Sequence, residues 1–272
     1  MVSAVHRPGD GLLRRLMPRR PSMNPPATSL DFVARARNGL AASGLCPCCP
    51  GEVSVVLFDS ASWGELEAGA TELLDARERQ RAARFRFGRD RCAYVLAHAM
   101  WRVVLGVCLD VSPGEVPLHF LPSGQPQLPG TRLATSLSHS GPVVLIAVGQ
   151  GCALGVDVER WPPRVSMETL LPVICSPGEG DALHALPPEQ REWTLLQLWT
   201  RKESLLKAFG TGLEQAPASF RAPSGALVAP PQGMAGMPCR AIDLTLPEDL
   251  AGALAVSLDM ARYPIRILAC GA

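Results

Sequence analysis

The sequence predicts an α+β protein made of two similar halves, residues 51–150 and 151–272, with the active site in a cleft between them. The order of expected elements indicates this class, because strand, helices and strands are followed by a strand end, helices and strands. Each half holds about 100 residues, and the two halves share no visible sequence identity. The arrangement corresponds to an internal pseudo-dimer.

The first half opens with an expected strand over residues 52–59, EVSVVLFD. Its alternating pattern and its content of β-branched residues predict this strand. Residues 63–104 have helical periodicity, for example at Tyr94, Ala97 and Met100. A breaker-rich stretch with short strands follows at 111–130. Residues 134–160 alternate apolar and polar side chains around a glycine-rich turn, which predicts a β-hairpin.

The second half repeats this order. Residues 166–210 are expected to be helical, with interruptions at SPGEGD and LPPEQ. The remaining chain returns to expected strands in SFRAPSGALV, ALAVSLDM and PIRILAC, with the polar MARYP turn between the last two. These segments predict the strands that complete the second half.

Residues 1–50 are expected to form a basic, disordered extension. They are rich in proline, glycine and serine, and residues 1–40 hold seven arginines against two acidic residues. Met23 is an alternative start of the chain. The stretch LCPCCPG at 45–51 is either a loop or a zinc-binding turn, although no second half-site with matching spacing follows it.

The composition excludes several classes of protein. A formal net charge of +1 offers no overall field for nucleic acid or a membrane surface. No apolar run reaches the roughly 18 residues of a membrane-spanning helix, and the N-terminus lacks the apolar segment of a secretory signal. Nine scattered cysteines indicate reduced thiols. We therefore expect a cytoplasmic monomer that binds neither nucleic acid nor membrane.

Two carboxylates in GVDVER are the first candidate site residues. Asp157 and Glu159 stand two apart on an expected strand, so their side chains leave the same face about 7 Å apart. The alternative without a functional role is a strand whose end frays into solvent. Paired carboxylates at the end of a core strand otherwise need a cation.

A helix expected over residues 193–209 adds a third carboxylate. Glu203 and Lys207 lie about 40° apart on its wheel, with the apolar residues Leu196 and Trp199 on the same face. An exposed ion pair is the alternative interpretation. Because the opposite face is also apolar, the helix is expected to be buried or to flank a cleft, and a buried carboxylate needs a partner.

Lysine is rare in this chain. Of 26 basic residues, only Lys202 and Lys207 are lysine, and they flank Glu203. In a chain that uses arginine elsewhere, retained lysine indicates positions that do not tolerate a guanidinium, since an ammonium is a compact donor that touches a carboxylate and a phosphate together. Asp157, Glu159 and Glu203 would together suit Mg²⁺, which takes oxygen ligands and substrate phosphate. Phosphoryl chemistry follows from that interpretation.

Cations and hydroxyl groups elsewhere are candidates for phosphate binding. Residues 77–91 hold seven arginines with Phe85 and Phe87 between them, either as a solvated helix face or as a phosphate-binding surface. In SLSHSG, Ser138 and His139 precede an expected strand, and His139 is either a phosphate donor or a turn residue. No G-x-S-x-G elbow or Walker loop is present, which argues against a hydrolase or a P-loop NTPase.

Taken together, GVDVER, about 40 intervening residues and WTRKESLLKAFG resemble the paired motifs of the surfactin-type 4′-phosphopantetheinyl transferases. SLSHSG resembles a third motif of that family, and ARERQRAARF with RDRCAYVLAHAMWR resembles its N-terminal helices. The resemblance covers about residues 52–270. It implies a pseudo-dimeric fold and transfer of phosphopantetheine from coenzyme A to a serine of an apo carrier protein, with Mg²⁺ and release of adenosine 3′,5′-bisphosphate.

The resemblance also implies roles for individual residues. Asp157, Glu159 and Glu203 would hold the metal, and Glu203 would act on the carrier serine as a base, directly or through water. Lys207 would contact the reacting phosphate. Arg81, Ser138 and His139 would bind the phosphates of coenzyme A.

Two positions depart from the family pattern. Gln125 stands where the family often has lysine or arginine, so the contact with coenzyme A is expected to be weaker. Glu78 occupies a position that is basic in the family, with Arg77 or Arg79 as substitutes. Lys202 matches the motif, and its role, as a coenzyme or a carrier contact, stays open.

Two other functions remain as alternatives. One is a non-catalytic module that binds coenzyme A or an acidic carrier through the arginine-rich segment. The other is a different Mg²⁺-dependent phosphodiester enzyme, which would hydrolyse coenzyme A without a carrier. The carrier itself, whether of fatty-acid, polyketide, nonribosomal-peptide or aminoadipate-reductase type, depends on surface shape.

Overall fold

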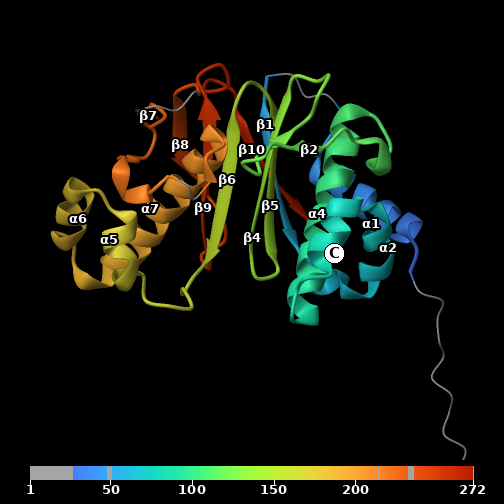
Figure 1. Cartoon of the computed structure of the whole chain (residues 1–272), viewed down its shortest axis with the longest axis horizontal. Helices are drawn as coiled ribbons and strands as arrows, with labels where there is room; N and C mark the ends of the chain where they lie inside the picture. The colour runs from blue at the N-terminus through green and yellow to red at the C-terminus, as the bar shows by residue number, and fades with distance from the viewer. Residues whose placement is uncertain (1–26, 48–50, 213–214, 232–235, 272) are drawn as a thin grey trace, which may run out of the picture.

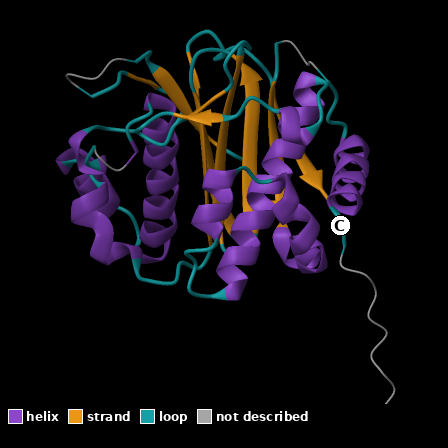
Figure 2. Ribbon diagram, turned by 45° about the vertical axis from the view of Figure 1, so that its right-hand side comes forward, coloured by secondary structure: helices purple, strands orange, loops and turns teal. Residues whose placement is uncertain are grey.

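The computed structural model describes residues 27–47, 51–212, 215–231 and 236–271. Their mixed α+β arrangement has two four-stranded sheets with the strand orders β10-β1-β5-β4 and β6-β9-β8-β7. Helices α1, α2 and α4 cover the outer face of the first sheet, and α5, α6 and α7 cover that of the second (Figure 1). The ribbon view from a second direction shows the same layering (Figure 2).

The first sheet is formed by β1 (Val53–Asp59), β4 (Leu133–Ser140), β5 (Val143–Gln150) and β10 (Ile265–Cys270). Strand β1 runs parallel to β10 and antiparallel to β5, and β5 pairs with β4. Its helices are α1 (Ser29–Ser43), α2 (Glu67–Leu73), α3 (Ala76–Ala82) and α4 (Gly88–Leu109), with a 3-10 turn η1 (Ser60–Leu66) after β1. A small separate ribbon joins β2 (His119–Phe120) to β3 (Pro126–Gln127), after the 3-10 turn η2 (Pro113–Glu115).

The second sheet is formed by β6 (Leu154–Arg160), β7 (Leu227–Val228), β8 (Cys239–Asp243) and β9 (Leu250–Ser257), paired antiparallel throughout. Between β6 and β7 the chain forms η3 (Met167–Leu170), α5 (Leu171–Ile174), α6 (Pro177–His184), α7 (Pro188–Phe209) and η5 (Pro217–Ser219). Helix α7 ends at Gly210, which takes a left-handed conformation with φ of 73°.

Alternation along the strands sends side chains to two different cores. On β5, Leu145 and Ala147 belong to the core between the two sheets, whereas Val144, Ile146 and Val148 belong to the core under α4. On β6, Val156 and Val158 face the core between the sheets. The intervening residues of β6, including Asp157 and Glu159, therefore lie on the α7 side of the second sheet.

Helix α4 passes a test for membrane-spanning helices by its length and composition, but 72% of the tested window is buried inside the protein. It is the central helix of the first core, with residues such as Leu96, Met100 and Val103 at 0% exposure. Its apolar character is thus explained by packing against a sheet and against other helices.

Three expectations about secondary structure need correction. Residues 29–43 form helix α1, so the predicted disordered extension is wrong there. Phe32, Ala36 and Leu40 supply an apolar stripe that is buried in the first core, and a Thr28–Asp31 capping box starts the helix. Residues 1–26, including Met23, and residues 48–50 of the cysteine-rich stretch lie outside the described residues.

The predicted hairpin around the glycine-rich turn is also wrong. Strand β5 pairs with β4 and β1 on its two edges, so no edge is left for β6, which joins β9 in the other sheet. The hairpin lies one strand earlier, between β4 and β5. The third correction concerns the boundary expected at residue 150, because β10, near the C-terminus, crosses back to the first sheet.

Candidate active site

Two edge strands, β4 of the first sheet and β6 of the second, meet through serine side chains. The Ser136 hydroxyl accepts from the backbone N–H of Val156 at 3.1 Å, and the Ser140 hydroxyl accepts from that of Arg160 at 3.3 Å. Between them, the Ser138 hydroxyl donates to Oδ1 of Asp157 at 2.7 Å. Serines two apart share one face of β4, so the strand alternation creates this seam. The seam brings Ser138 to the predicted carboxylates.

Helix α7 lies directly against β6 because residue 155 is glycine. A Cβ atom at Gly155 would lie 2.0 Å from the carbonyl oxygen of Ser204 and 2.7 Å from the backbone nitrogen of Ala208. No other residue type permits this approach of helix and strand without a shift of the backbone. The close approach sets Glu203 and Lys207 of α7 beside Asp157 and Glu159 of β6.

Lys207 pairs with Asp157. Its Nζ atom donates to Oδ1 of Asp157 at 2.8 Å and to the carbonyl oxygen of Val156 at 3.0 Å. Asp157 is only 5% exposed, and its Oδ1 atom accepts from both Ser138 and Lys207. A buried aspartate is thus held by one cation and one hydroxyl.

Two carboxylate oxygens remain without partners. Asp157 Oδ2 and Glu203 Oε1 are buried and have no hydrogen-bond partner among the described residues. Burial, with a further contribution from the charge of Asp157, raises the pKa of Glu203 to about 7, while Lys207 acts in the opposite direction. Burial and the charge of Asp157 also raise the pKa of Glu159, against the hydrogen bonds from Ser140 and Trp199. Negative charge in this cluster is therefore incompletely compensated.

A cation would supply that compensation. Orphaned buried oxygens and mutually repelling carboxylates fit a divalent ion with oxygen ligands. Within the part of the chain that the structure describes, however, no group of three His, Cys, Asp or Glu side chains stands ready to hold a metal. The metal role of Asp157, Glu159 and Glu203 stays a prediction that fits the donor set.

Two of the predicted phosphate-binding residues, Arg81 and Lys207, line neighbouring cavities. Arg81 lines a cavity of about 450 Å³ together with Arg77 and Arg84. A neighbouring cavity of about 220 Å³ reaches Lys207, and the two cavities share the lining residues His98, Phe120 and Gly124. Cationic side chains on α3 and α7 therefore border connected hollows, which suits an anionic ligand.

His139 faces a different hollow. It lines a cavity of about 520 Å³ with Phe85 and Arg164. Partial withdrawal from water lowers the pKa of its imidazole, and the positive charges of His98, Lys207 and Arg81 add to this, although the residue keeps an exposed edge. Ser138 is instead buried and bound to Asp157, so its hydroxyl orients the carboxylate.

The two departures from the family pattern are explained by their contacts. The Gln125 amide donates to the carbonyl oxygen of Ala208 at 3.3 Å, near the C-terminus of α7, and lines the cavity that reaches Lys207. Glu78 is turned inward at 1% exposure, where its carboxylate binds His98 at 2.9 Å and Arg102 at 2.8 Å. Arg77 lies with its guanidinium 5.0 Å from the Phe120 ring centroid and lines the larger basic cavity, whereas Arg79 bonds the backbone at Leu74.

Sequence reasoning missed Ser140, Gly155 and the buried Glu78–His98–Arg102 network. The signal for Ser140 was present, because it stands two residues after Ser138, in the same relation that joins Asp157 and Glu159. The requirement for glycine at 155 and the partners of Glu78 depend on contacts between distant segments, which a pattern in one segment does not reveal.

Comparison with known proteins supports the resemblance. Residues 153–232 match the 4′-phosphopantetheinyl transferase superfamily. The chain is 36% identical over 145 residues to the 4′-phosphopantetheinyl transferase HetI of Nostoc, covering 52% of this chain and 61% of that protein. It is 32% identical over 110 residues to AcpT of Salmonella typhi, covering 40% of this chain and 56% of that protein.

A third relative is the 4′-phosphopantetheinyl transferase of Bacillus subtilis, 26% identical over 148 residues, with 54% of this chain and 65% of that protein covered. The chain thus spans about 60% of the length of the relatives that it matches best among these. The matched segment contains β6 and α7, and with them Asp157, Glu159, Glu203 and Lys207. Through this segment the chain is similar to members of the 4′-phosphopantetheinyl transferase superfamily.

Proposed function

We propose that the protein transfers the 4′-phosphopantetheine arm of coenzyme A to a serine of an apo carrier protein. One observation carries this proposal: Asp157 is held by Lys207 and Ser138 while its second oxygen and one oxygen of Glu203 remain buried without a partner. Such a cluster binds a cation and, through it, a phosphate group. The cavity with Arg77, Arg81 and Arg84 adjoins the cavity that Lys207 lines, and it offers charge to a polyanionic co-substrate.

In the proposed reaction, the oxygen of the carrier serine forms a bond to the phosphorus that bears pantetheine. The bond from that phosphorus to the oxygen of the second phosphate breaks, and adenosine 3′,5′-bisphosphate leaves with the electron pair. The serine proton passes to Glu203, directly or through water. Mg²⁺, when bound by Asp157, Glu159 and Glu203, would neutralise charge on the pyrophosphate oxygens.

The remaining residues bind and orient the co-substrate. The ammonium of Lys207 stays fixed by the Val156 carbonyl and Asp157 and offers its charge to the reacting phosphate. Arg81 is proposed to bind phosphates of coenzyme A from the cavity of about 450 Å³, and His139 from the cavity that it lines with Phe85 and Arg164. Ser138 is proposed to act through Asp157 and through proximity to those phosphates.

The proposal includes the wider architecture. The two sheets, each covered by its own helices, would correspond to the two halves of a pseudo-dimer, with the active site at the seam of β4 and β6. We further propose that the protein acts as a cytoplasmic monomer, binds no nucleic acid or membrane, and serves carriers of fatty-acid or secondary-metabolite synthesis.

The decisive experiment is a mass-shift assay. The full chain is incubated with coenzyme A, Mg²⁺ and each of several apo carriers of acyl, peptidyl and aryl type, and intact masses are recorded. A gain of one phosphopantetheine, lost when the carrier serine is changed to alanine, supports the proposal. If no carrier gains mass but coenzyme A or a carrier binds without Mg²⁺, the non-catalytic binding module is the correct function. Cleavage of coenzyme A without a carrier would point to a different phosphodiester enzyme.

A further inference from the structure

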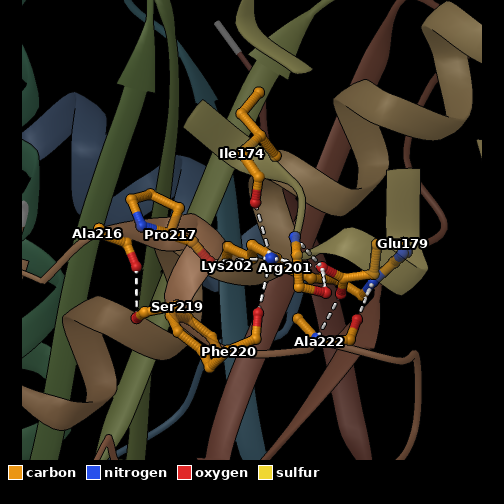
Figure 3. A network of polar contacts seen from close by, with 10 residues as sticks. Ile174, Glu179, Arg201, Lys202, Ala216, Pro217, Ser219, Phe220 and Ala222 are labelled. Atoms are coloured by element: carbon orange, nitrogen blue, oxygen red, sulfur yellow. Dashed lines mark hydrogen bonds and ion pairs between the residues drawn. The ribbon is translucent and has the colours of Figure 1, made fainter. Parts of the chain in front are cut away.

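A buried ammonium group lies on the side of α7 that faces α5 and α6. Lys202 is 0% exposed. Its Nζ atom donates to Glu179 Oε2 at 2.7 Å and to the carbonyl oxygens of Ile174, Pro217 and Phe220 at 2.7, 2.9 and 2.7 Å. Figure 3 shows the ammonium at the centre of these oxygens, which come from separate segments of the chain. We call Lys202 and its four acceptors the lysine hub.

The hub explains why this position carries lysine. Four oxygens converge on one point, and an ammonium is a compact donor with three N–H groups that point in different directions. A guanidinium is planar and larger, and it spreads its donors in a fork that suits one planar partner. Arginine, the common cation of this chain, therefore does not fit the hub.

Glu179 connects the hub to the start of α6 and to Ala222. Its Oε2 atom accepts from the backbone and hydroxyl groups of Ser176, and its Oε1 atom accepts from the backbone N–H of Ala222 at 2.8 Å. Arg201, the neighbour of Lys202, bonds the carbonyl oxygen of Ala222 at 2.9 Å. The start of α6 and the segment 217–222 are thus tied to α7 at adjacent positions of that helix.

These ties hold α7 from the side opposite its strand contact. Lys202 and Glu203 are consecutive, so their side chains leave the helix about 100° apart. On another side of the helix, the carbonyl group of Ser204 lies against Gly155 of β6. Helix α7 is therefore fixed between β6 and the hub. A rotation of 20° about its axis would displace a side-chain end at a radius of about 5–6 Å by about 2 Å.

We propose that Lys202 is a positioning residue: through the hub it sets the rotation of α7 and thereby the placement of Glu203 and Lys207. This inference rests on the proposed function for its kinetic consequence, although its structural part is independent of any activity. Displacements of about 1 Å in a catalytic group reduce turnover by about 10²-fold. Lys202 is thereby distinguished from Lys207, which faces Asp157 and the cavity.

The test compares the full-length wild type with Lys202→Met/Glu179→Gln, which removes both buried charges together and leaves no ion unpaired. Lys202→Arg is a second variant that keeps the charge. Leu195→Ala is the matched control, because Leu195 is a buried core residue of the same helix, about two turns before Lys202. Each protein is examined by thermal unfolding, by hydrogen–deuterium exchange over residues 203–212 and by steady-state kinetics well below the unfolding temperature.

For both hub variants we expect kcat to fall about 10²-fold while KM for coenzyme A changes less than about threefold. Exchange over residues 203–212 should rise about tenfold or more. Leu195→Ala should lower the unfolding temperature while its kcat stays near that of the wild type. This split separates positioning from a general loss of stability.

Several outcomes would overturn the inference. The first is a hub variant whose kcat and hydrogen–deuterium exchange equal those of the wild type. The second is a hub variant that is as stable as Leu195→Ala and loses no more kcat than that control. If neither hub variant folds, the hub serves folding alone and the positioning role is rejected. If the wild type transfers nothing to any carrier, the proposed function fails, and the exchange of residues 203–212 still decides whether Lys202 positions α7.

Discussion

Lys207 Nζ lies 2.8 Å from Oδ1 of Asp157, and so the two halves of the paired motif are joined by an ion pair between α7 and β6. Lys207 acts on Glu203, its expected partner on the same helix face, through its charge, which lowers the pKa of Glu203 against the effect of burial. Asp157 therefore shares its first oxygen with a cation of the protein and keeps its second oxygen available. This relationship leads to the first prediction, in which the carboxylate cluster holds a further cation.

Removing a carboxylate of the cluster should abolish transfer without unfolding the protein. For Asp157→Ala and Glu203→Ala we expect the rate of holo-carrier formation to fall at least about 10²-fold, because charge on the reacting phosphate loses its compensation. Chelation of divalent metal should reduce the transfer rate of the wild type by a similar factor. Asp181→Asn, an exposed carboxylate on α6, is the control. A near-normal rate for either alanine variant, with folding checked by circular dichroism, would show the metal assignment to be wrong.

Arg81 should contribute to co-substrate binding and not to the chemical step. We expect Arg81→Ala to raise KM for coenzyme A about tenfold with little change in kcat, since an arginine–phosphate contact is made before and during the reaction. The effect should diminish at high salt. Arg221→Ala, an exposed arginine in the other half, provides the comparison. Equal KM values for the two variants would remove Arg81 from the binding site.

Gln125 offers a gain-of-affinity prediction. Its amide lies against the Ala208 carbonyl at the C-terminal end of α7 and lines the cavity that reaches Lys207. A lysine there would keep a donor for that carbonyl and bring a charge to the same cavity. We expect Gln125→Lys to lower KM for coenzyme A several-fold, measured beside Gln125→Met, which adds no charge. An unchanged KM in the lysine variant would mean that the phosphates of coenzyme A do not bind in this cavity.

Gly155 should not tolerate even a methyl group. The Cβ atom of Gly155→Ala would meet the Ser204 carbonyl oxygen at 2.0 Å, so α7 must move away from β6. We expect a loss of about 1–3 kcal/mol of stability in chemical denaturation, together with a marked loss of kcat. Gly178→Ala, where an added Cβ meets nothing within 4 Å, should leave both unchanged. Equal stability of the two variants would contradict the close packing of helix and strand.

The buried Glu78 network should control stability in acid. Burial by itself raises the pKa of Glu78, but the hydrogen bonds from His98 and the Asp75 N–H capping contact, with the charge of Arg102, lower it below its ordinary value of 4.5. The folded state therefore binds this proton less readily than the unfolded state, and the ionised group stabilises the protein above about pH 4.5. That contribution is lost as pH falls through the folded-state pKa.

The measurement compares urea unfolding of the wild type and Glu78→Gln between pH 7 and pH 3. The variant should be less stable at pH 7 by about 1–3 kcal/mol, because Arg102 and His98 lose a charged partner. The difference between the two proteins should shrink below about pH 4.5. A constant difference across the range would mean that Glu78 does not titrate with folding.

Local patterns were sufficient for the candidate residues. The two-residue spacing of Asp157 and Glu159 sets them on one face of β6, and the helical spacing sets Glu203 and Lys207 within about 40° of each other. These relationships depend only on the geometry of one strand or one helix. The α+β class followed in the same way, since the order of strands and helices is written in the periodicity of the chain.

Pairings between distant segments were beyond such reasoning. The predicted hairpin failed because strand β5 is occupied on both edges, which only the complete sheet reveals. The last strand, β10, lies beside β1 across more than 200 residues of sequence. Helix α1 was not predicted because it has few apolar residues, Phe32, Ala36 and Leu40. The stabilisation that these residues provide depends on the core in which they are buried.

By itself, the sequence determined the class of the fold and the chemical types in the site: three carboxylates, one lysine beside them and a set of arginines. Tertiary structure decided how they are used. It paired Lys207 with Asp157 across two elements, and it buried Lys202 against Glu179 and three carbonyl groups. The physical reason is that the partner of a buried charge is selected by the folded backbone, whose converging oxygens come from segments that no local pattern connects.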